Sequence, residues 1–535
     1  MADLDLIIKN ALIYDGSGGA PYRASIGVSG DRIAALSPEL HGGLAIIDGD
    51  GLCASPGFVD THSHSEFTML QAPSCESKIL QGVTTEINGN CGLSAAPLLG
   101  DAHARREDDQ RELGISERWS TMDEYFTLLR ERKHMINYAT LVGHGNIRGS
   151  VMGYRNKHAE AFEMTGMAEL LSQVLESGVF GLSTGLIYPP GIFTSAEELI
   201  ELLRLVKHNG SLVYATHMRS EGDRLVESVS EAIRIGRDGG FKIHISHLKT
   251  AGKDNWRKID EVLGIIDEAR SEGQRITFDR YPYTAAATDL DTVLPSWAYE
   301  GGNDQELLRL ADNTARKKLI DHMRSRYKER NDYKSIFVSS VVTEKNKWTE
   351  GKSILEIAEA RRVMPEDAVI DLLIGERIRV SAIFESMSED NLRRFLKHPL
   401  CMVGSDSAVR NFSGITATGK PHPRAFGTFP RYLGRYIIGE KLMPLAEGIR
   451  RMTSLPAETF GIYQRGRIQE GNFADIVLFD PQRVSDRATY ADPFQKPEGI
   501  RTVIVNGAVA VDNGEIQDGV RPGRILRRSE LRIKQ

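Results

Sequence analysis

The feature that most constrains the fold is a long alternation of apolar, strand-like runs with amphipathic helices through the middle of the chain. The segment Ser195–Gly210 is typical, because it opens with the capping sequence Ser-Ala-Glu-Glu and carries an apolar stripe that begins at Leu199 and Leu202. Such alternation over roughly 400 residues favours a parallel sheet covered by helices. The number of strands further favours closure into an eight-stranded (β/α)8 TIM-like barrel.

The strand candidates number one more than such a barrel needs. Between residues 289 and 376 the alternation gives way to a polar, charged segment, which we interpret as an insertion. Assigning Val380–Phe384 to this insertion leaves eight strands. The insertion could cover the barrel mouth and exclude water, or it could be a solvated helical excursion. The candidates are Phe58–His62, Val83–Ile87, Ala139–His144, Val179–Ser183, Val213–His217, Lys242–His247, Ile276–Tyr281, Val380–Phe384 and Met402–Asp406.

Both ends of the chain have a different predicted secondary-structure pattern from the middle. From Leu6 to Ile47, short β-rich pieces such as Leu6–Ile8 and Ala11–Tyr14 are separated by turn residues, and similar strands return at Phe473–Phe479 and Arg501–Gly507. Neither end has enough apolar surface to be stable alone. We therefore predict a small β-sandwich domain built from residues 1–55 and 465–535, around a barrel of residues 56–464.

Composition points to a small-molecule partner. The 535 residues include 67 Lys and Arg against 73 Asp and Glu, and no run of like charge suggests a nucleic-acid or membrane surface. The cysteines Cys53, Cys75, Cys91 and Cys401 are scattered and are expected to be reduced thiols. Without a secretory signal or a run of about 18 apolar residues, a cytoplasmic protein is expected, and the oligomeric state is left open.

Polar side chains close several of the predicted strands. His62 and His64 share one face of an extended strand, a spacing that lets two imidazoles grip one ion. Because the carboxyl ends of barrel strands gather at one mouth, we expect a cluster of functional residues there. Each has a simpler alternative, since the cysteine could be a packed turn thiol, the later histidines core residues and the aspartate a helix cap. The expected cluster is His62, His64, Cys91, His217, His247 and Asp406.

Several motifs, taken in order, resemble one family over nearly the whole chain. They are Pro56-Gly57-Phe58-Val59-Asp60-Thr61-His62-Ser63-His64, Gly89-Asn90-Cys91-Gly92, Gly181-Leu182-Ser183-Thr184-Gly185-Leu186-Ile187-Tyr188-Pro189-Pro190, Ala215-Thr216-His217-Met218-Arg219, Ile245-Ser246-His247, Val403-Gly404-Ser405-Asp406 and Pro421-His422-Pro423-Arg424. The pattern resembles the D-aminoacylase (N-acyl-D-amino-acid deacylase) family of the amidohydrolase superfamily. The His-x-His pair alone marks only the superfamily, whereas the Asn-Cys-Gly element and the Leu-Ser-Thr-Gly-Leu-x-Tyr-Pro-Pro element narrow the resemblance to this branch.

The resemblance implies a zinc site. Cys91, His217 and His247 would hold a tightly bound Zn²⁺, with His62, His64 and Asp406 beside it as hosts for a second, weaker metal. A thiolate and two imidazoles leave one position open for water, as in catalytic zinc sites. Related cyclic-amide hydrolases bridge two metals with a carboxylated lysine on the fourth strand. The candidate Val179–Ser183 contains no lysine, which disfavours that mechanism.

The implied reaction is hydrolysis of the amide bond of an N-acyl-D-amino acid. Hydroxide formed from zinc-activated water would attack the carbonyl carbon while Asp406 accepts the proton and later delivers it to the departing amine. Zinc, helped by His64 or His62, would stabilise the oxyanion. The products would be a carboxylic acid and a free D-amino acid.

The α-carboxylate of such a substrate needs a cation in the pocket. Arg424 offers a fork for two carboxylate oxygens, Lys249 a point charge, and Tyr188 and either Tyr283 or Tyr281 hydroxyl donors. Each could instead be an ordinary rim or surface residue. Two other functions remain open, namely an amidohydrolase acting on a cyclic amide or dipeptide, and a non-catalytic relative that only binds metal.

Overall fold

The computed structural model describes residues 4–206 and 210–528, and it confirms the predicted mixture of helices and strands. The middle of the chain forms two parallel sheets, one with the strand order β17-β13-β12-β11-β10-β9 and one with the order β6-β7-β8. Their strands are β6 Phe58–Asp60, β7 Val83–Asn88, β8 Asn137–Thr140, β9 Val142–Gly143, β10 Gly181–Gly185, β11 Val213–His217, β12 Lys242–Ile245, β13 Ile276–Arg280 and β17 Cys401–Val403.

The two parallel sheets are joined at both edges. Only Leu141 separates β8 from β9. At the other edge the backbone N–H of Thr61 lies 3.4 Å from the carbonyl oxygen of Val403, and Ser63 forms a parallel bridge with Ser407. Strand β16, which contains most of Val380–Phe384, pairs with neither parallel sheet.

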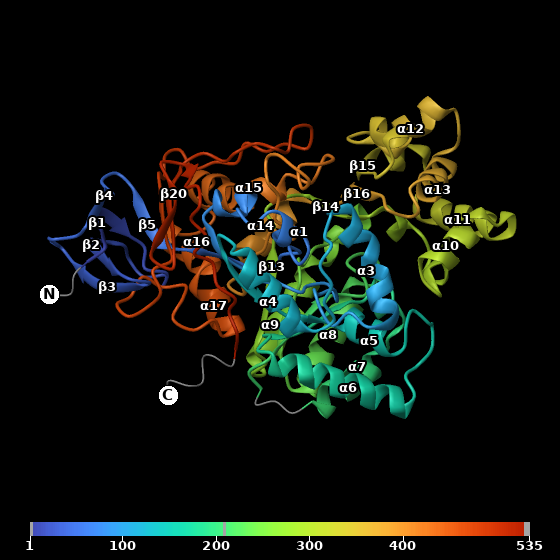
Figure 1. The fold of residues 1–535 in the computed structure, drawn as a ribbon. Helices are drawn as coiled ribbons and strands as arrows, with labels where there is room; N and C mark the ends of the chain where they lie inside the picture. The colour runs from blue at the N-terminus through green and yellow to red at the C-terminus, as the bar shows by residue number, and fades with distance from the viewer. Residues whose placement is uncertain (1–3, 207–209, 529–535) are drawn as a thin grey trace.

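Helices follow the parallel strands and cover them (Figure 1). The helix predicted from Ser195 is α7, Ala196–Leu205, and the Ser195 hydroxyl caps it by accepting from the N–H of Glu198 at 3.1 Å. The predicted segment continues to Gly210 and includes residues 207–209, which lie outside the described residues. The other helices here are α1 Thr68–Gln71, α2 Glu76–Ile79, α3 Gly100–Glu112, α4 Met122–Arg132, α5 His144–Val151, α6 Ala161–Glu176, α8 Leu225–Gly239, α9 Ile259–Ser271, α14 Glu389–Lys397, α15 Arg424–Arg431, α16 Leu445–Met452 and α17 Ser454–Phe460.

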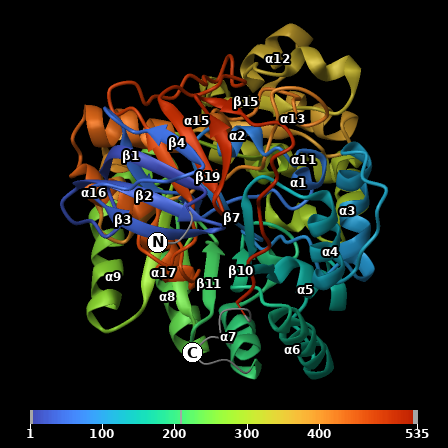
Figure 2. The same ribbon diagram turned by 60° about the vertical axis from the view of Figure 1, so that its left-hand side comes forward.

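Strands from both chain ends pair within one nine-stranded sheet in the described part of the chain. Strand β5 pairs antiparallel with β18, so that Pro56 lies opposite Ile476. The two ends therefore lie side by side, away from most of the helices (Figures 1 and 2). The sheet contains β1 Leu6–Ile13, β2 Tyr22–Ser29, β3 Arg32–Ser37, β4 Ala45–Asp48, β5 Cys53–Pro56, β18 Ile476–Phe479, β19 Ile500–Val505, β20 Ala508–Asp512 and β21 Glu515–Ile516.

Residues 285–385 form a packed unit with a small sheet of their own. Strand β16 pairs antiparallel with β14 and β15, and the helices around this small sheet bury their own apolar core, which includes Leu319 and Leu372. In Figure 1 the unit lies at the end of the molecule opposite the nine-stranded sheet. Its elements are β14 Ala285–Asp289, α10 Asn303–Ala311, α11 Asn313–Arg326, β15 Ile336–Ser340, α12 Ile354–Arg361, α13 Pro365–Gly375 and β16 Ser381–Glu385.

None of the helices in the described ranges has both the length and the apolar character that crossing a membrane requires.

Candidate metal centre

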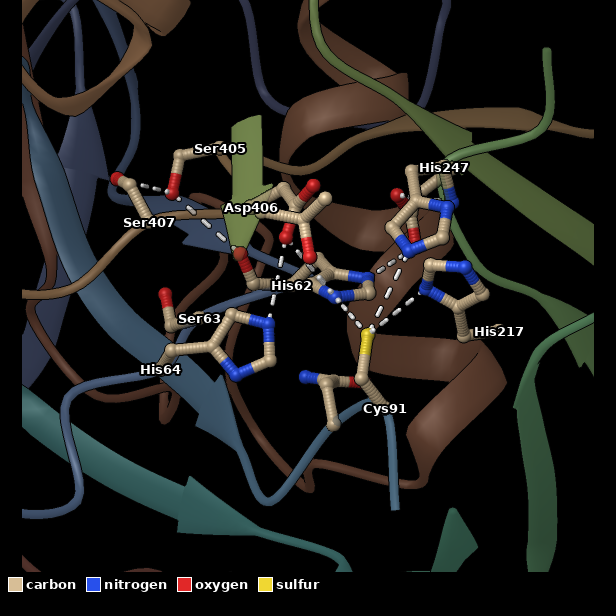
Figure 3. Close-up of polar contacts among 12 residues, drawn as sticks. His62, Ser63, His64, Cys91, His217, His247, Ser405, Asp406 and Ser407 are labelled. Carbon is tan, nitrogen blue, oxygen red and sulfur yellow. Dashed lines mark hydrogen bonds and ion pairs between the residues drawn. The ribbon is translucent and has the colours of Figure 1, made fainter. Parts of the chain in front are cut away.

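The structure brings the six polar residues of the predicted cluster together (Figure 3). They form two overlapping groups that share one thiol, and within each group all the donor atoms lie within 4.8 Å of one another. The first group is Cys91, His217 and His247, and the second is Cys91, His62, His64 and Asp406.

The donor spacing in the first group fits a tetrahedral ion. The Cys91 sulfur lies 3.4 Å from Nε2 of His247 and 3.7 Å from Nδ1 of His217. Zinc bound by sulfur at about 2.3 Å and by nitrogen at about 2.0 Å separates such donors by about 3.5 Å. The residues present therefore suit a Zn²⁺ ion with two protein nitrogens and one thiolate.

The second group shares the Cys91 sulfur, which lies 3.3 Å from Nε2 of His62. One carboxylate oxygen of Asp406, Oδ1, lies 3.5 Å from Nε2 of His62 and 3.3 Å from Nε2 of His64. The other, Oδ2, lies 2.9 Å from the guanidinium of Arg424. Asp406 therefore lies between the imidazoles and a buried cation.

His217 ends β11, but the other donor residues sit in loops just beyond the strands, which corrects part of the sequence prediction. His62, His247 and Asp406 were expected within strands, but β6, β12 and β17 end two to three residues earlier. Cys91, His247 and Asp406 have positive φ angles of 52°, 38° and 51°. A left-handed conformation ends an extended strand and costs about 1–3 kcal/mol in non-glycine residues, so it persists where the surroundings enforce it. Three such residues around one point indicate a functional site.

Two sequence motifs fit together to position Cys91. Gly185, at the end of β10, packs so closely on the Cys91 loop that a β-carbon there would lie 2.1 Å from the Cys91 carbonyl oxygen. Ser183, on the same strand, accepts a hydrogen bond from the N–H of Gly92 at 3.0 Å and donates one to the carbonyl of Gly89. The motif that contains Cys91 and the motif that contains Ser183 and Gly185 thus pack directly against each other.

Gly185→Ala should therefore displace the Cys91 loop and weaken zinc binding about tenfold or more, because even outer partners of metal ligands change affinity by about 10–100-fold. Isothermal titration of the metal-free protein with zinc measures this. The matched control is Gly264→Ala, since a β-carbon at Gly264 in α9 meets nothing within 4 Å. Parental zinc affinity in Gly185→Ala would contradict the role given to this contact.

Two carboxylates behind the histidines were not singled out from the sequence. Asp279, fully buried at the end of β13, lies 3.3 Å from Nδ1 of His62 and 2.7 Å from Nε2 of His244, and accepts the backbone N–H of His247 at 3.0 Å. Glu221 lies 2.8 Å from Nδ1 of His247. Carboxylates of this kind orient metal-binding imidazoles and fix their tautomers. In the sequence, Asp279 is a carboxylate near the end of a predicted strand, and Glu221 lies four residues after His217. These positions were the signals that could have identified them.

Electrostatic interactions favour the thiolate form of Cys91 and the carboxylate form of Asp406. Burial opposes the thiolate of Cys91, but the nearby His62 and His247 lower its pKa well below 9. Burial also opposes ionisation of Asp406, and the Arg424 guanidinium, followed by the histidines, lowers its pKa well below its usual range. Although burial disfavours the charged form of His64, hydrogen bonds to Asp406 and Cys91 raise its pKa to about 9. Thiolate and carboxylate are the forms that bind metal.

The predicted substrate-binding residues have different surroundings. Arg424 is buried, contacts Asp406 and lies 4.5 Å over the ring of Tyr281, whose buried hydroxyl has no hydrogen-bond partner among the described residues. Lys249 lies beyond the end of β12, and its ammonium lies 2.9 Å from Nδ1 of His247 and pairs with Glu221.

The two remaining tyrosines differ in their relation to the centre. The ring of Tyr188 lies 5.0 Å from the ring of His217, and its hydroxyl lies 2.8 Å from the hydroxyl of Thr288. Tyr283 directs its hydroxyl toward Asp486 and the carbonyl of Pro423, both at 3.5 Å. Tyr188 therefore borders the donor cluster directly, whereas the Tyr283 hydroxyl is engaged elsewhere.

The chain is similar to known proteins over nearly its whole length. Residues 45–511 match the model of the amidohydrolase family. A D-aminoacylase from Alcaligenes xylosoxydans xylosoxydans is 35% identical over 98% of this chain and 98% of its own. An N-acyl-D-glutamate deacylase from the same organism is 35% identical over 98% of this chain and 97% of its own.

A solved structure extends the similarity to three dimensions. The N-acyl-D-glutamate deacylase of Bordetella bronchiseptica, complexed with zinc and a phosphonate inhibitor that mimics the tetrahedral intermediate, has a TM-score of 0.84 and 33% sequence identity. The match covers 98% of this chain and 100% of that one. The chain therefore belongs to the amidohydrolase family, in the branch of the D-aminoacylases and N-acyl-D-amino-acid deacylases.

Proposed function

We propose that this protein is a zinc-dependent N-acyl-D-amino-acid deacylase, which hydrolyses the linear amide to a carboxylate and a free D-amino acid. The observation that carries the proposal is the convergence of one thiol and two imidazoles at zinc-like spacing beside a carboxylate that contacts a buried arginine. Relatives named as D-aminoacylase and N-acyl-D-glutamate deacylase, at 35% identity over nearly the full chain, support the substrate class.

We also propose that the parallel strands close into an eight-stranded barrel of residues 56–464. The contacts between β6 and β17 and the near continuity of β8 and β9 support closure. The nine-stranded sheet supports a separate β-sandwich domain of residues 1–55 and 465–535. The sheet of β14 to β16 supports an insertion over the barrel mouth that is wider than residues 289–376, because it begins at Ala285 and ends at Glu385. The hydrogen bond from Arg424 to the carbonyl of Ala287 at 3.2 Å supports a position of β14 beside the metal centre.

In this proposal Cys91, His217 and His247 hold the tighter zinc, and His62, His64 and Asp406 can host a second. A bound zinc supplies Lewis acidity and makes a water molecule acidic enough to lose a proton near neutral pH. Asp406 takes that proton on its carboxylate and returns it to the amine nitrogen as the C–N bond breaks. His64, whose Nε2 lies 3.3 Å from the same carboxylate, is proposed to donate a hydrogen bond to the developing oxyanion.

Arg424 is the proposed anchor for the substrate α-carboxylate. Its guanidinium is buried beside Asp406, and its fork geometry suits two carboxylate oxygens. The Tyr281 hydroxyl is the better placed of the two tyrosine donors, because it is buried without a partner among the described residues while the Tyr283 hydroxyl faces Asp486. Lys249 adds positive charge from beside His247, and Tyr188 borders the site beside His217.

Arg424→Lys should raise KM about tenfold or more, because lysine keeps the charge but loses the two-pronged hydrogen bonding. Steady-state kinetics with an N-acetyl-D-amino acid measures this. Arg431→Lys is the matched control, since Arg431 pairs with Asp486 at 3.0 Å instead of with a candidate ligand. An unchanged KM in Arg424→Lys would move the carboxylate site elsewhere.

A panel of N-acetyl-D- and N-acetyl-L-amino acids, hydantoins and dihydroorotate tests the function directly. The zinc-loaded protein should release free amino acid from the D-substrates and leave the L-isomers and cyclic amides nearly unchanged. Turnover of the cyclic compounds alone would favour the alternative amidohydrolase, and full zinc occupancy without any hydrolysis would favour a non-catalytic metal-binding protein.

A further inference from the structure

A fully buried ammonium lies behind the metal centre. Lys78, in the short helix α2, has no exposed surface and is not one of the six donors. Its Nζ lies 2.7 Å from Oδ2 of Asp60 and 2.9 Å from Oε1 of Glu86, two carboxylates that are also fully buried. Burial opposes the charge of Lys78, but Asp60 and then Glu86 outweigh it and raise its pKa. Lys78 is therefore a buried cation held by two buried anions.

The same ammonium spans the two loops that carry His62, His64 and Asp406. It donates to the hydroxyl of Ser63 at 3.0 Å, in the loop that follows β6. It also donates to the hydroxyl of Ser405 at 2.8 Å and to the carbonyl of Ser407 at 3.0 Å. These two serines flank Asp406 (Figure 3).

Asp60, which pairs with Lys78, also accepts hydrogen bonds from the backbone of both loops. Its Oδ1 accepts from the N–H of His62 at 3.2 Å and from the N–H of Ser405 at 2.8 Å. The carbonyl of Ser407, which accepts from Lys78, also accepts from the N–H of His64 at 3.2 Å. The N–H of Asp406 in turn donates to the carbonyl of His62 at 2.8 Å. Lys78 thus fixes the relative position of the two loops without touching a donor atom.

We propose that Lys78 is a positioning residue that sets the distance between Asp406 and the His62–His64 pair. The inference rests on the proposed function, because it concerns the same site. An apolar side chain at this position would avoid the free-energy cost of burying a charge. The positioning role explains why a lysine is present instead, because its ammonium supplies three hydrogen-bond donors to two separate loops. The left-handed conformation of Asp406, with φ of 51°, needs such a constraint.

Lys78→Met removes the donors while keeping most of the side-chain volume. We expect kcat to fall about 10–100-fold while KM changes by less than about threefold, because the substrate contacts are untouched. We also expect about tenfold weaker binding of the second metal, measured by titrating the one-zinc protein. In the cobalt-substituted protein, the visible absorption bands that report ligand geometry should shift relative to the parent.

Arg465→Met is the control for the loss of a buried ion pair as such. Arg465 pairs with Asp475 at side-chain exposures of 2% and 4%, at the nine-stranded sheet. The Arg465→Met variant should have a lower melting temperature than the parent. Its cobalt spectrum and its kcat per bound metal should remain at parental values. If Lys78→Met behaves in the same way as Arg465→Met, its role is purely structural and the proposal is overturned.

Ser405→Ala provides a second route if Lys78→Met does not fold. This change removes one acceptor of Lys78 and one donor to Asp60 without leaving a buried charge unpaired. A drop in kcat of about three- to tenfold with the same direction of spectral shift is expected. Parental values of both would refute the positioning role. Should the parent hydrolyse no N-acyl-D-amino acid, the proposed function fails, while the cobalt spectra and metal affinities still decide the role of Lys78.

Discussion

Cys91→Ala is expected to remove most of the zinc from the purified protein, with zinc affinity lowered roughly a hundredfold or more. The sulfur is the one donor that both groups share, and it lies within 3.3–3.7 Å of three imidazole nitrogens. Loss of a direct ligand should cost more than the roughly 10–100-fold lost when an outer partner is removed. Inductively coupled plasma mass spectrometry of the dialysed variant measures the remaining zinc.

Cys53→Ala is the control for this experiment. Cys53 is also a buried thiol, but it lies in β5 of the nine-stranded sheet and outside both donor groups. The Cys53→Ala variant should retain the same amount of zinc as the parent, which is expected to bind about one zinc per chain. Stoichiometric zinc in Cys91→Ala would show that the thiol is not a ligand, whatever the activity of the variant.

Asp406→Asn should lower kcat by about 10²–10⁴-fold, because an amide cannot accept and return the proton that general acid–base catalysis requires. The tighter zinc should remain bound, since its three proposed ligands are unchanged. Steady-state kinetics and metal analysis on the same sample separate these two effects.

Asp486→Asn is the matched control for Asp406→Asn. Its carboxylate is 14% exposed and pairs with Arg431, much as the 11% exposed carboxylate of Asp406 pairs with Arg424. Turnover within about twofold of the parent is expected for Asp486→Asn. Near-parental activity in Asp406→Asn would assign proton transfer to another group.

The donor cluster could be predicted from the sequence because it depends on strand order and not on detailed packing. His62, Cys91, His217 and Asp406 each follow an apolar run, and parallel strands bring their carboxyl ends to one edge. The exact strand ends could not be predicted in the same way. A left-handed residue such as His247, with φ of 38°, is enforced by contacts from other parts of the chain.

The residues that support the donors were harder to predict for the same physical reason. Asp279 contacts His62, which is 217 residues away in the sequence, and Lys78 bonds both Ser63 and Ser405, the latter 327 residues away. Neither residue belongs to a short motif with a mechanism of its own. The surroundings of Tyr281 and Tyr283 likewise differ because of Asp486, which enters from a distant loop.

Anomalous X-ray diffraction at the zinc absorption edge tests the central claim most directly. Crystals of the zinc-loaded protein should give a strong anomalous peak within about 2.0–2.3 Å of the Cys91 sulfur, Nδ1 of His217 and Nε2 of His247. A peak elsewhere, or full-occupancy zinc without the Cys91 sulfur in its coordination sphere, would contradict the account.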